Sequence, residues 1–149
     1  MNSTDPVVVC NSLVKVYDSP AGRVQAVRGV DLEIEPATLT AVVGPSGSGK
    51  SSLLRMLAAL DHPTAGYAAI SGIDLNAAKP GTRARLRRRL ITHVYQRPAD
   101  NLLAHLTSRQ QLTRLRSKTG GVDADEALAA LGIESRSDHL PDQLSGGEK

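Results

Sequence analysis

Residues 43–52 read VGPSGSGKSS, and this density of glycine and proline excludes the interior of a helix or a strand. Before the stretch, residues 39–43 read LTAVV, a short apolar run suited to a buried strand. After it, residues 51–60 read SSLLRMLAAL and consist mostly of good helix formers. A glycine-rich loop between a strand and a helix is the context of a phosphate-binding loop. The stretch therefore predicts an α/β fold with an anion site at the start of a helix.

The residue types in this loop match a nucleoside triphosphate as the ligand. Gly44, four residues, then Gly49-Lys50-Ser51 form the P-loop pattern. Its glycines let backbone N–H groups approach phosphate oxygens, Lys50 adds a charge toward the β- and γ-phosphates, and the Ser51 hydroxyl is placed to bind Mg²⁺. The pattern leaves kinase, GTPase and transport ATPase open. The predicted nucleotide-binding residues here are Gly44, Pro45, Ser46, Gly47, Ser48, Gly49, Lys50, Ser51 and Ser52.

Composition limits the function classes further. The chain has 149 residues with no Phe, no Trp and three Tyr, so its core has to be built from Leu, Val, Ile and Ala. The lone Cys10 excludes an internal disulfide and favours a reducing compartment. No signal peptide and no apolar run of about 20 residues is present, which predicts a cytoplasmic location. A net charge of +3 gives no argument for nucleic-acid binding, and no nucleic-acid partner is predicted.

Hydrophobic periodicity places strands and helices in alternation along the chain. It predicts two antiparallel strands at 7–16 and 27–34 around a turn at 18–22, and further strands at 39–43, 67–70 and 91–95. Helices are predicted at 51–60, 82–89, 102–116 and 123–131. Strands that alternate with helices predict the α/β fold class. The arginines of 82–89 are interpreted as an exposed helical face; they are Arg83, Arg85, Arg87, Arg88 and Arg89.

The end of the chain, LSGGEK at 144–149, resembles the signature motif of ATP-binding cassette (ABC) proteins. Ser145 is a good helix N-cap, and Gly146 and Gly147 leave its amides bare, so the segment suits a second anion. Val94-Tyr95-Gln96 is similar to the Q-loop of that family, and Tyr17 to the aromatic residue that stacks on adenine. The segment LDHPTAG at 60–66 is similar to the turn after the P-loop helix, so the resemblance covers 7–149.

The resemblance implies a P-loop ABC-type cassette that binds ATP and Mg²⁺. Its α/β fold would have an antiparallel β edge packed on a parallel core sheet, with a helical subdomain. It implies Lys50 and Gln96 as catalytic residues, and Ser51 and Gln96 as the residues that place Mg²⁺. Tyr17 would contribute by stacking rather than by hydrogen bonding, so Tyr17→Phe should bind ATP like the wild type. Ser145, Gly146 and Gly147 would contact the ATP of a second cassette.

The family also implies partners and a domain plan. A separate transmembrane permease and a second cassette would be the partners, and the chain would lie on the inner face of the cell membrane. Residues 7–101 would form the core with P-loop and Q-loop, 102–144 the helical subdomain, and 144–149 the start of the signature. The subgroup resembled is the lipoprotein-releasing and macrolide-exporter cassettes. Residues 108–111 (SRQQ) depart from it, because that subgroup usually shows an acidic residue and an asparagine there.

Two alternatives stay open beside a transport ATPase: a soluble ABC protein of DNA repair or translation, and a nucleotide-binding fragment without catalysis. The resemblance further implies that residues 1–149 stop before the Walker B aspartate, the general-base glutamate and the later histidine of the family. The chain alone is therefore expected to be poorly stable and not to hydrolyse ATP.

Overall fold

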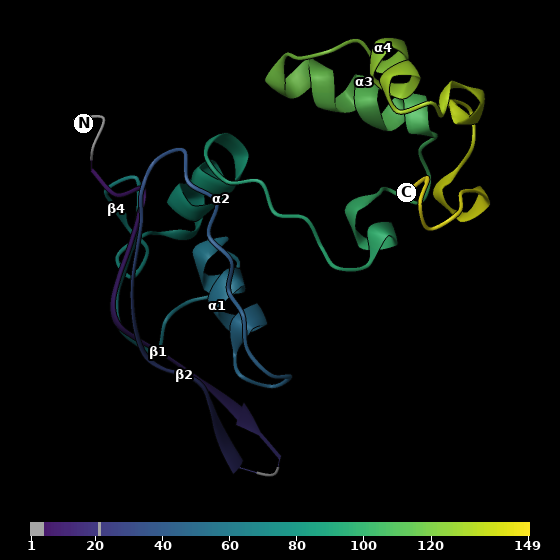
Figure 1. The fold of residues 1–149 in the computed structure, drawn as a ribbon. Helices are drawn as coiled ribbons and strands as arrows, with labels where there is room; N and C mark the ends of the chain where they lie inside the picture. The colour runs from purple at the N-terminus through teal and green to yellow at the C-terminus, as the bar shows by residue number, and fades with distance from the viewer. Residues whose placement is uncertain (1–4, 21) are drawn as a thin grey trace. The chain divides into compact units, whose positions relative to one another are not determined.

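The computed structural model describes residues 5–20 and 22–149, which divide into two compact units (Figure 1). The first unit extends to His93 and the second from Val94 to Lys149. The first holds the β-sheet and the P-loop, and the second is built from short helices. Each unit is described by itself below.

A four-stranded sheet forms the framework of the first unit. Its strands are β1 (Val8–Ser19), β2 (Gly22–Ile34), β3 (Ala65–Ile70) and β4 (Ile73–Asp74), in the order β2-β1-β3-β4, and each neighbouring pair is antiparallel. The predicted antiparallel hairpin and the strand at 67–70 are confirmed. Both hairpin strands are longer than predicted, because the ladder continues to the pair Ser19–Gly22. Of the predicted turn at 18–22, Ala21 lies outside the described residues.

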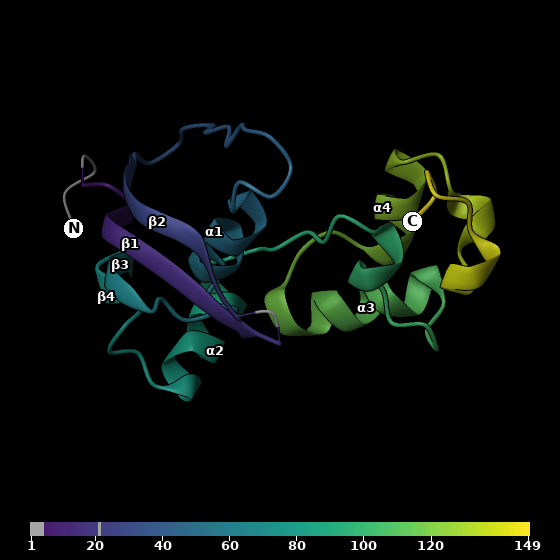
Figure 2. The same cartoon turned by 90° about the horizontal axis from the view of Figure 1, so that it is seen from below.

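Two helices, α1 (Lys50–Leu57) and α2 (Pro80–Arg89), lie on one face of this sheet (Figures 1 and 2). They confirm the helices predicted at 51–60 and 82–89. The core between helices and sheet is aliphatic, with one cysteine and one methionine in place of any aromatic ring. Its buried residues are Cys10, Leu13, Val27, Leu53, Met56, Ala59, Ala68, Ile70, Leu75 and Leu86.

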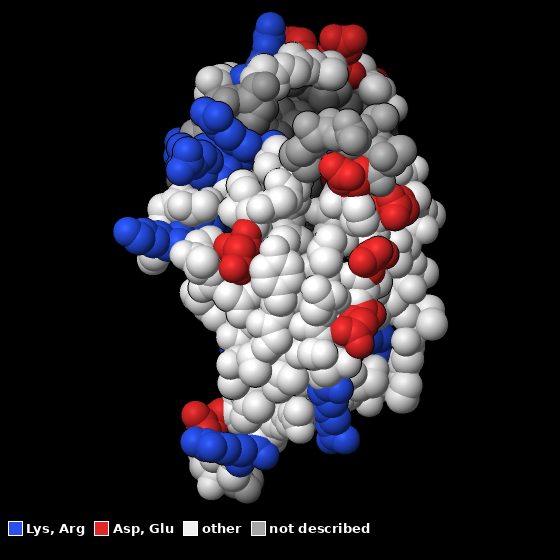
Figure 3. Space-filling view, turned by 90° about the vertical axis from the view of Figure 1, so that its left-hand side faces the viewer, with Lys and Arg blue, Asp and Glu red and all other residues white. Residues whose placement is uncertain are grey.

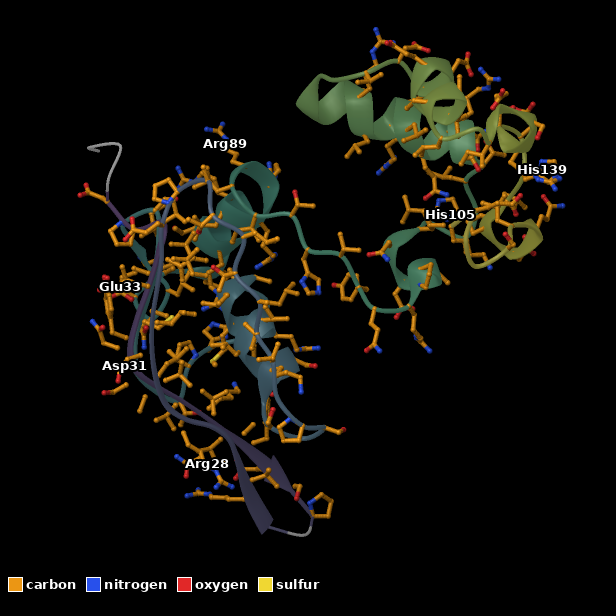
Figure 4. All side chains as sticks on the ribbon, viewed as in Figure 1. Arg28, Asp31, Glu33, Arg89, His105 and His139 are labelled. Carbon is orange, nitrogen blue, oxygen red and sulfur yellow. The ribbon has the colours of Figure 1, made fainter. Side chains whose placement is uncertain are left out.

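The opposite face of the sheet is open to solvent. Asp31 and Glu33 of β2 are exposed, whereas Leu32 and Ile34, which alternate with them, are partly buried, as the two-residue period of a strand requires. Figure 4 shows Asp31 and Glu33 on the side away from α1 and α2. In the space-filling view of that side, Asp and Glu side chains form a line and Lys and Arg side chains gather opposite (Figure 3).

Two predicted strands are wrong. Residues 39–43 and 91–95 form no strand in the structure, and Leu39, Val43 and Val94 are largely exposed. Within 5–20 and 22–149 all strand pairs are antiparallel, so the predicted parallel core sheet is not formed there. The physical reason is that a strand needs a hydrogen-bonded neighbour, and a parallel strand also needs cover on both faces. The described residues supply neither to these two segments.

The interpretation of all five arginines of α2 as an exposed face is wrong for Arg83, which is only 3% exposed. Its guanidinium donates to the backbone oxygen of Leu75 at 3.1 Å and to that of Asp61. Arg87 donates to the backbone oxygen of Ala59 at 2.6 Å. These two side chains therefore tie α2 to the end of α1, whereas the side chain of Arg89 is exposed (Figure 4).

The second unit holds α3 (Ser108–Thr119), α4 (Ala124–Ala130) and three short 3-10 helices at Pro98–Asn101, Glu134–Arg136 and Pro141–Gln143. The helix predicted at 102–116 begins later, at Ser108, because Thr107 and Gln110 form a capping box there. The helix predicted at 123–131 is confirmed, with Asp123 as its N-cap accepting from the Asp125 N–H at 2.9 Å.

Candidate functional site

The glycine-rich loop leads directly into α1, and its last residue makes the junction. Gly49 is the N-cap of α1 with φ +89°, a left-handed conformation that side chains rarely adopt. A Cβ at this position would also overlap the backbone oxygen of Ala26 in β2. Only glycine therefore fits, and this close approach holds the loop against the hairpin.

The start of α1 presents backbone donors. The first intrahelical bond after the cap runs from the Leu53 N–H to the Gly49 oxygen at 2.9 Å. The preceding N–H groups of the first turn have no intrahelical partner in any α-helix, and the helix dipole places partial positive charge there. No Asp or Glu occurs in residues 43–52. The loop and the helix start thus offer donors to an anion without an opposing carboxylate.

Lys50 places its ammonium across this loop. Its Nζ donates to the backbone oxygens of Gly44 at 2.9 Å and Pro45 at 2.6 Å, and lies 3.4 Å from Ser48 Oγ. The two carbonyls hold the charge next to the glycine backbone instead of leaving it in solvent. The side chain of Lys50 therefore lies on the loop, and its role toward phosphates stays a prediction.

A cavity of 810 Å³ lies between the loop and β2, within the range typical of small-molecule sites. Lys50 and Arg28 contribute cations to its lining, and Gly44, Gly47 and Ser48 contribute the loop wall. Most of the remaining lining comes from β2 and from 40–43, where apolar residues predominate beside Gln25 and Thr40. A nucleotide has charged phosphates and a largely apolar base. The cavity offers cations for the phosphates and apolar surface for the base.

A divalent cation at this site would depend on few protein ligands. Among residues 5–20 and 22–149, no three His, Cys, Asp or Glu side chains are grouped so as to hold a metal ion. Ser51 is exposed in the first turn of α1, beside Lys50. This set fits Mg²⁺, which keeps several waters and relies on phosphate oxygens with one or two protein groups.

Tyr17 lies on β1, one residue beyond the part of the hairpin that borders the cavity. It pairs with Val24, and the preceding residue Val16 pairs with Gln25, which lines the cavity. Its ring is half-buried, its hydroxyl donates to Asp61 Oδ2 at 2.8 Å, and Lys15 Nζ lies 4.8 Å from the ring centre. The expectation of a role without hydrogen bonding omitted this bond, because it joins residues 44 positions apart.

Asp61 is the residue that sequence reasoning missed. Partial burial acts to raise the pKa of its carboxyl, but hydrogen bonds from Lys15, Tyr17 and the His62 N–H outweigh it and lower the pKa from 3.8 to about 2. The segment 60–66 marked a turn in the sequence. Nothing in the turn itself indicated that β1 would bring two side chains onto this carboxylate.

Gln96 belongs to the second unit and is exposed in a loop, not at the end of a strand as predicted. The Asn101 side chain holds this loop: its Oδ1 accepts from the Tyr95 N–H at 2.7 Å, and its Nδ2 donates to the Tyr95 oxygen at 3.1 Å. Gln96 is therefore exposed on a loop whose conformation is held by the hydrogen bonds of Asn101.

The signature residues also lie in the second unit, where they form a single turn. The Lys149 N–H donates to the Ser145 oxygen at 3.2 Å, and Glu148 accepts from the Ser145 N–H at 2.7 Å and from Arg136 at 2.9 Å. The bond from the Ser145 backbone is the main reason that the pKa of Glu148 falls to about 2. Gly146 and Gly147 are exposed, with open space where a Cβ would lie. The turn thus presents bare backbone.

The structure therefore brings together the loop, Lys50, Ser51 and the hairpin that carries Tyr17 in the first unit. Gln96 and the signature residues are placed within the second. In the part of the chain that the structure describes, no helix is both long and apolar enough to cross a membrane.

Comparison with known proteins gives concordant results. The model of the family described as ABC transporter matches residues 27–149. The lipoprotein-releasing system ATP-binding protein LolD of Hahella chejuensis is 37% identical over 150 residues, covering 98% of this chain and 65% of that protein. LolD 2 of Caulobacter vibrioides is 35% identical over 150 residues, covering 98% and 66%. The predicted resemblance to lipoprotein-releasing cassettes is confirmed.

Solved structures show the same similarity at the level of the fold. The ATP-binding cassette MJ0796, in a dimeric post-hydrolysis state bound to ADP and Pi, superposes with a TM-score of 0.80 and 30% identity. The match covers 95% of this chain and 64% of that one. The predicted cassette fold is confirmed, and the chain spans about two-thirds of the length of the proteins it matches.

Proposed function

The chain belongs to the ABC transporter family, and on that premise we propose that it is the ATP-binding subunit of a transporter. The observation that carries the proposal is the position of Lys50, whose ammonium lies on a glycine loop at the start of α1. An ammonium, bare helix amides and hydroxyls within one loop suit a triphosphate better than any uncharged ligand.

The residues take distinct roles in this proposal. Lys50 and the backbone of 44–52 hold the phosphates, and the ring of Tyr17 supports the base. Ser51 and Gln96 hold Mg²⁺, which when bound neutralises charge on the phosphates. Ser145, Gly146 and Gly147 present their backbone to the nucleotide of a second cassette. The exposed backbone of Gly146 and Gly147 supports this last role, since exposed backbone N–H groups are what an incoming phosphate requires. The Ser145 N–H already donates to Glu148.

The partners in this proposal are a transmembrane permease and a second cassette, with the chain peripheral on the inner face of the membrane. The dimeric state named for the similar cassette MJ0796 and the lipoprotein-releasing system named for the relatives support it. Residues 7–101 would act as the core, 102–144 as the helical subdomain and 144–149 as the start of the signature.

For catalysis, the family supports an ATPase, and we propose that residues 1–149 by themselves bind nucleotide without turning it over. Resemblance to the family assigns no general-base glutamate within 1–149. General-base catalysis typically contributes about 10²–10⁴ to a rate. Phosphate release from MgATP by this chain should therefore stay at background. Release that disappears on Lys50→Ala would contradict the proposal.

The binding site is tested by calorimetry with a non-hydrolysable ATP analogue and Mg²⁺. Lys50→Ala should abolish binding, because it removes the charge at the loop. Lys79→Ala is the matched control: Lys79 is an exposed lysine at the N-cap of α2, as Lys50 begins α1, and its loss should leave binding unchanged. Equal affinity of the wild type and Lys50→Ala would show that the nucleotide does not bind at this loop.

A further inference from the structure

We propose that Asp61 is a positioning residue that orients the ring of Tyr17 for the base of the nucleotide. The inference rests on the proposed function, because Tyr17 matters only if a base binds there. Among the described residues, the side-chain hydrogen bonds of Asp61 lead to β1 and to its own turn, not to the loop. Asp61 acts through the tyrosine, and its carboxylate is the point where β1 and the turn after α1 meet.

Both oxygens of the Asp61 carboxylate are used. Oδ2 accepts from the Tyr17 hydroxyl at 2.8 Å. Oδ1 accepts from Lys15 Nζ at 2.6 Å and from the His62 N–H at 2.7 Å. The side chains of Lys15 and Asp61 are only 12% and 17% exposed, unlike an ordinary surface ion pair. A carboxylate held by three donors has little freedom to release the phenol.

Lys15 sets the face of the ring that is available. Lys15 and Tyr17 are two residues apart on β1, so their side chains leave the strand on the same face. The ammonium lies 4.8 Å from the ring centre, within the range of a cation–π contact, and also donates to the His62 oxygen at 2.7 Å. The ring is thus fixed at its hydroxyl and covered by a cation on one face. The opposite face is the one on which a base would stack.

The turn that carries Asp61 is itself anchored. The buried Arg83 donates to the Asp61 backbone oxygen. Thr64 connects the turn to β1, since its N–H donates to the Val14 oxygen at 2.8 Å and its Oγ1 accepts from the Val16 N–H at 3.0 Å. Contacts from α2 and β1 therefore define the position of the carboxylate, and through it the position of the ring.

The same hairpin reaches the phosphate loop. Val16 pairs with Gln25 of β2, and Ala26 next to it is the residue that Gly49 approaches closely. Tyr17 therefore lies next to the part of the hairpin that borders the phosphate loop. A nucleotide with its phosphates at the loop could place its base at this ring, so the orientation of the ring should affect binding of the base and leave binding of the phosphates unchanged.

The test compares two ligands of the full chain in the presence of Mg²⁺: a non-hydrolysable ATP analogue and inorganic tripolyphosphate, which lacks the base. Asp61→Asn should weaken binding of the analogue about three- to tenfold, the effect of weakening a hydrogen bond to a charged acceptor. Tripolyphosphate affinity should change less than about twofold. The control is Asp18→Asn, which removes the charge of a neighbouring carboxylate. The Asp18 side chain is 84% exposed and forms an ion pair with Arg23. This variant should alter neither affinity.

Tyr17→Phe provides a second variant that keeps the ring and loses the donor. Tyr17→Phe should show the same selective loss of affinity for the ATP analogue as Asp61→Asn. The double variant Tyr17→Phe with Asp61→Asn should show no further loss. If the ring acted by stacking alone, Tyr17→Phe would keep wild-type affinity. Tyrosine fluorescence is readable because the chain has no Trp. A tyrosine whose hydroxyl is hydrogen-bonded to a carboxylate fluoresces weakly. Asp61→Asn should therefore raise the tyrosine fluorescence of the wild type but not that of Tyr17→Phe.

The outcomes separate the two claims. Selective loss for the ATP analogue, with the fluorescence change, supports the positioning role. Equal loss for both ligands, or no loss for either, would overturn the positioning role without contradicting the proposed nucleotide site. A wild type that binds neither ligand would overturn the proposed function, and the positioning role with it.

Discussion

Residues 39–43 and strand β3 are two short segments whose sequences and structures disagree in opposite directions. The first reads LTAVV and is rich in β-formers, yet it forms no strand and leaves Leu39 and Val43 exposed. The second reads AGYAAI, with a glycine and three alanines, which are depleted in strands. It is nevertheless a strand with Ala68, Ala69 and Ile70 buried.

The difference between them is the presence of a neighbour. β3 pairs with β1 over Val8–Ile70, Val9–Ala69 and Cys10–Ala68, while α1 and α2 cover the sheet face. Residues 39–43 have no such pairing within the described residues. Strand formation here depends on available partners and burial more than on the propensity of the segment itself.

Hydrogen exchange should give the largest contrast between the two segments. Amides of 40–43 should exchange at close to their intrinsic rates. Interior amides of β1 and β3 exchange only when the first unit unfolds, so their exchange should be slower by the factor that the stability of that unit sets. The measurement is NMR or mass spectrometry at low protein concentration, where self-association does not protect exposed segments. Equal protection would show that 39–43 is paired in solution.

Two leucine substitutions should reproduce the contrast in stability. Leu13 of β1 is fully buried, so Leu13→Ala should lower the free energy of unfolding by about 2–5 kcal/mol. Leu39→Ala should change it by no more than about 0.5 kcal/mol, since Leu39 is fully exposed. Urea unfolding measures both. A cost for Leu39→Ala that matched Leu13→Ala would mean that 39–43 is buried after all.

Lowering the pH should have a smaller effect on the free energy of unfolding, through Asp61 in the turn before β3. The folded pKa of Asp61 is about 2, below the ordinary 3.8, so its contribution is fully present above pH 4 and is lost as the pH falls toward 2. The wild type should therefore lose more stability between pH 6 and pH 3 than Asp61→Asn does.

The control for this comparison is Asp18→Asn, which should follow the wild type. Urea midpoints at the two pH values measure the difference. A parallel decline of wild type and Asp61→Asn would show that the contacts of Asp61 do not depend on its charge.

Local features of the site were predictable from the sequence. The P-loop pattern located Gly49 and Lys50, and the helix that follows begins at Lys50, one residue before its predicted start. The N-cap at Asp123 was equally readable, because a cap acts on residues two or three positions away. The Tyr17–Asp61 bond, the burial of Arg83 and the loop position of Gln96 were not, since each depends on segments far apart in the chain.

The sequence by itself determined the glycine loop, the helices and the hairpin, because their patterns act within about ten residues. It also carried the family, since the resemblance rests on short motifs at their expected order. Only the tertiary structure decided which apolar segments become strands and which carboxylate holds Tyr17. Both outcomes depend on a partner brought from a distant part of the chain, and neither propensity nor spacing encodes where that partner will lie.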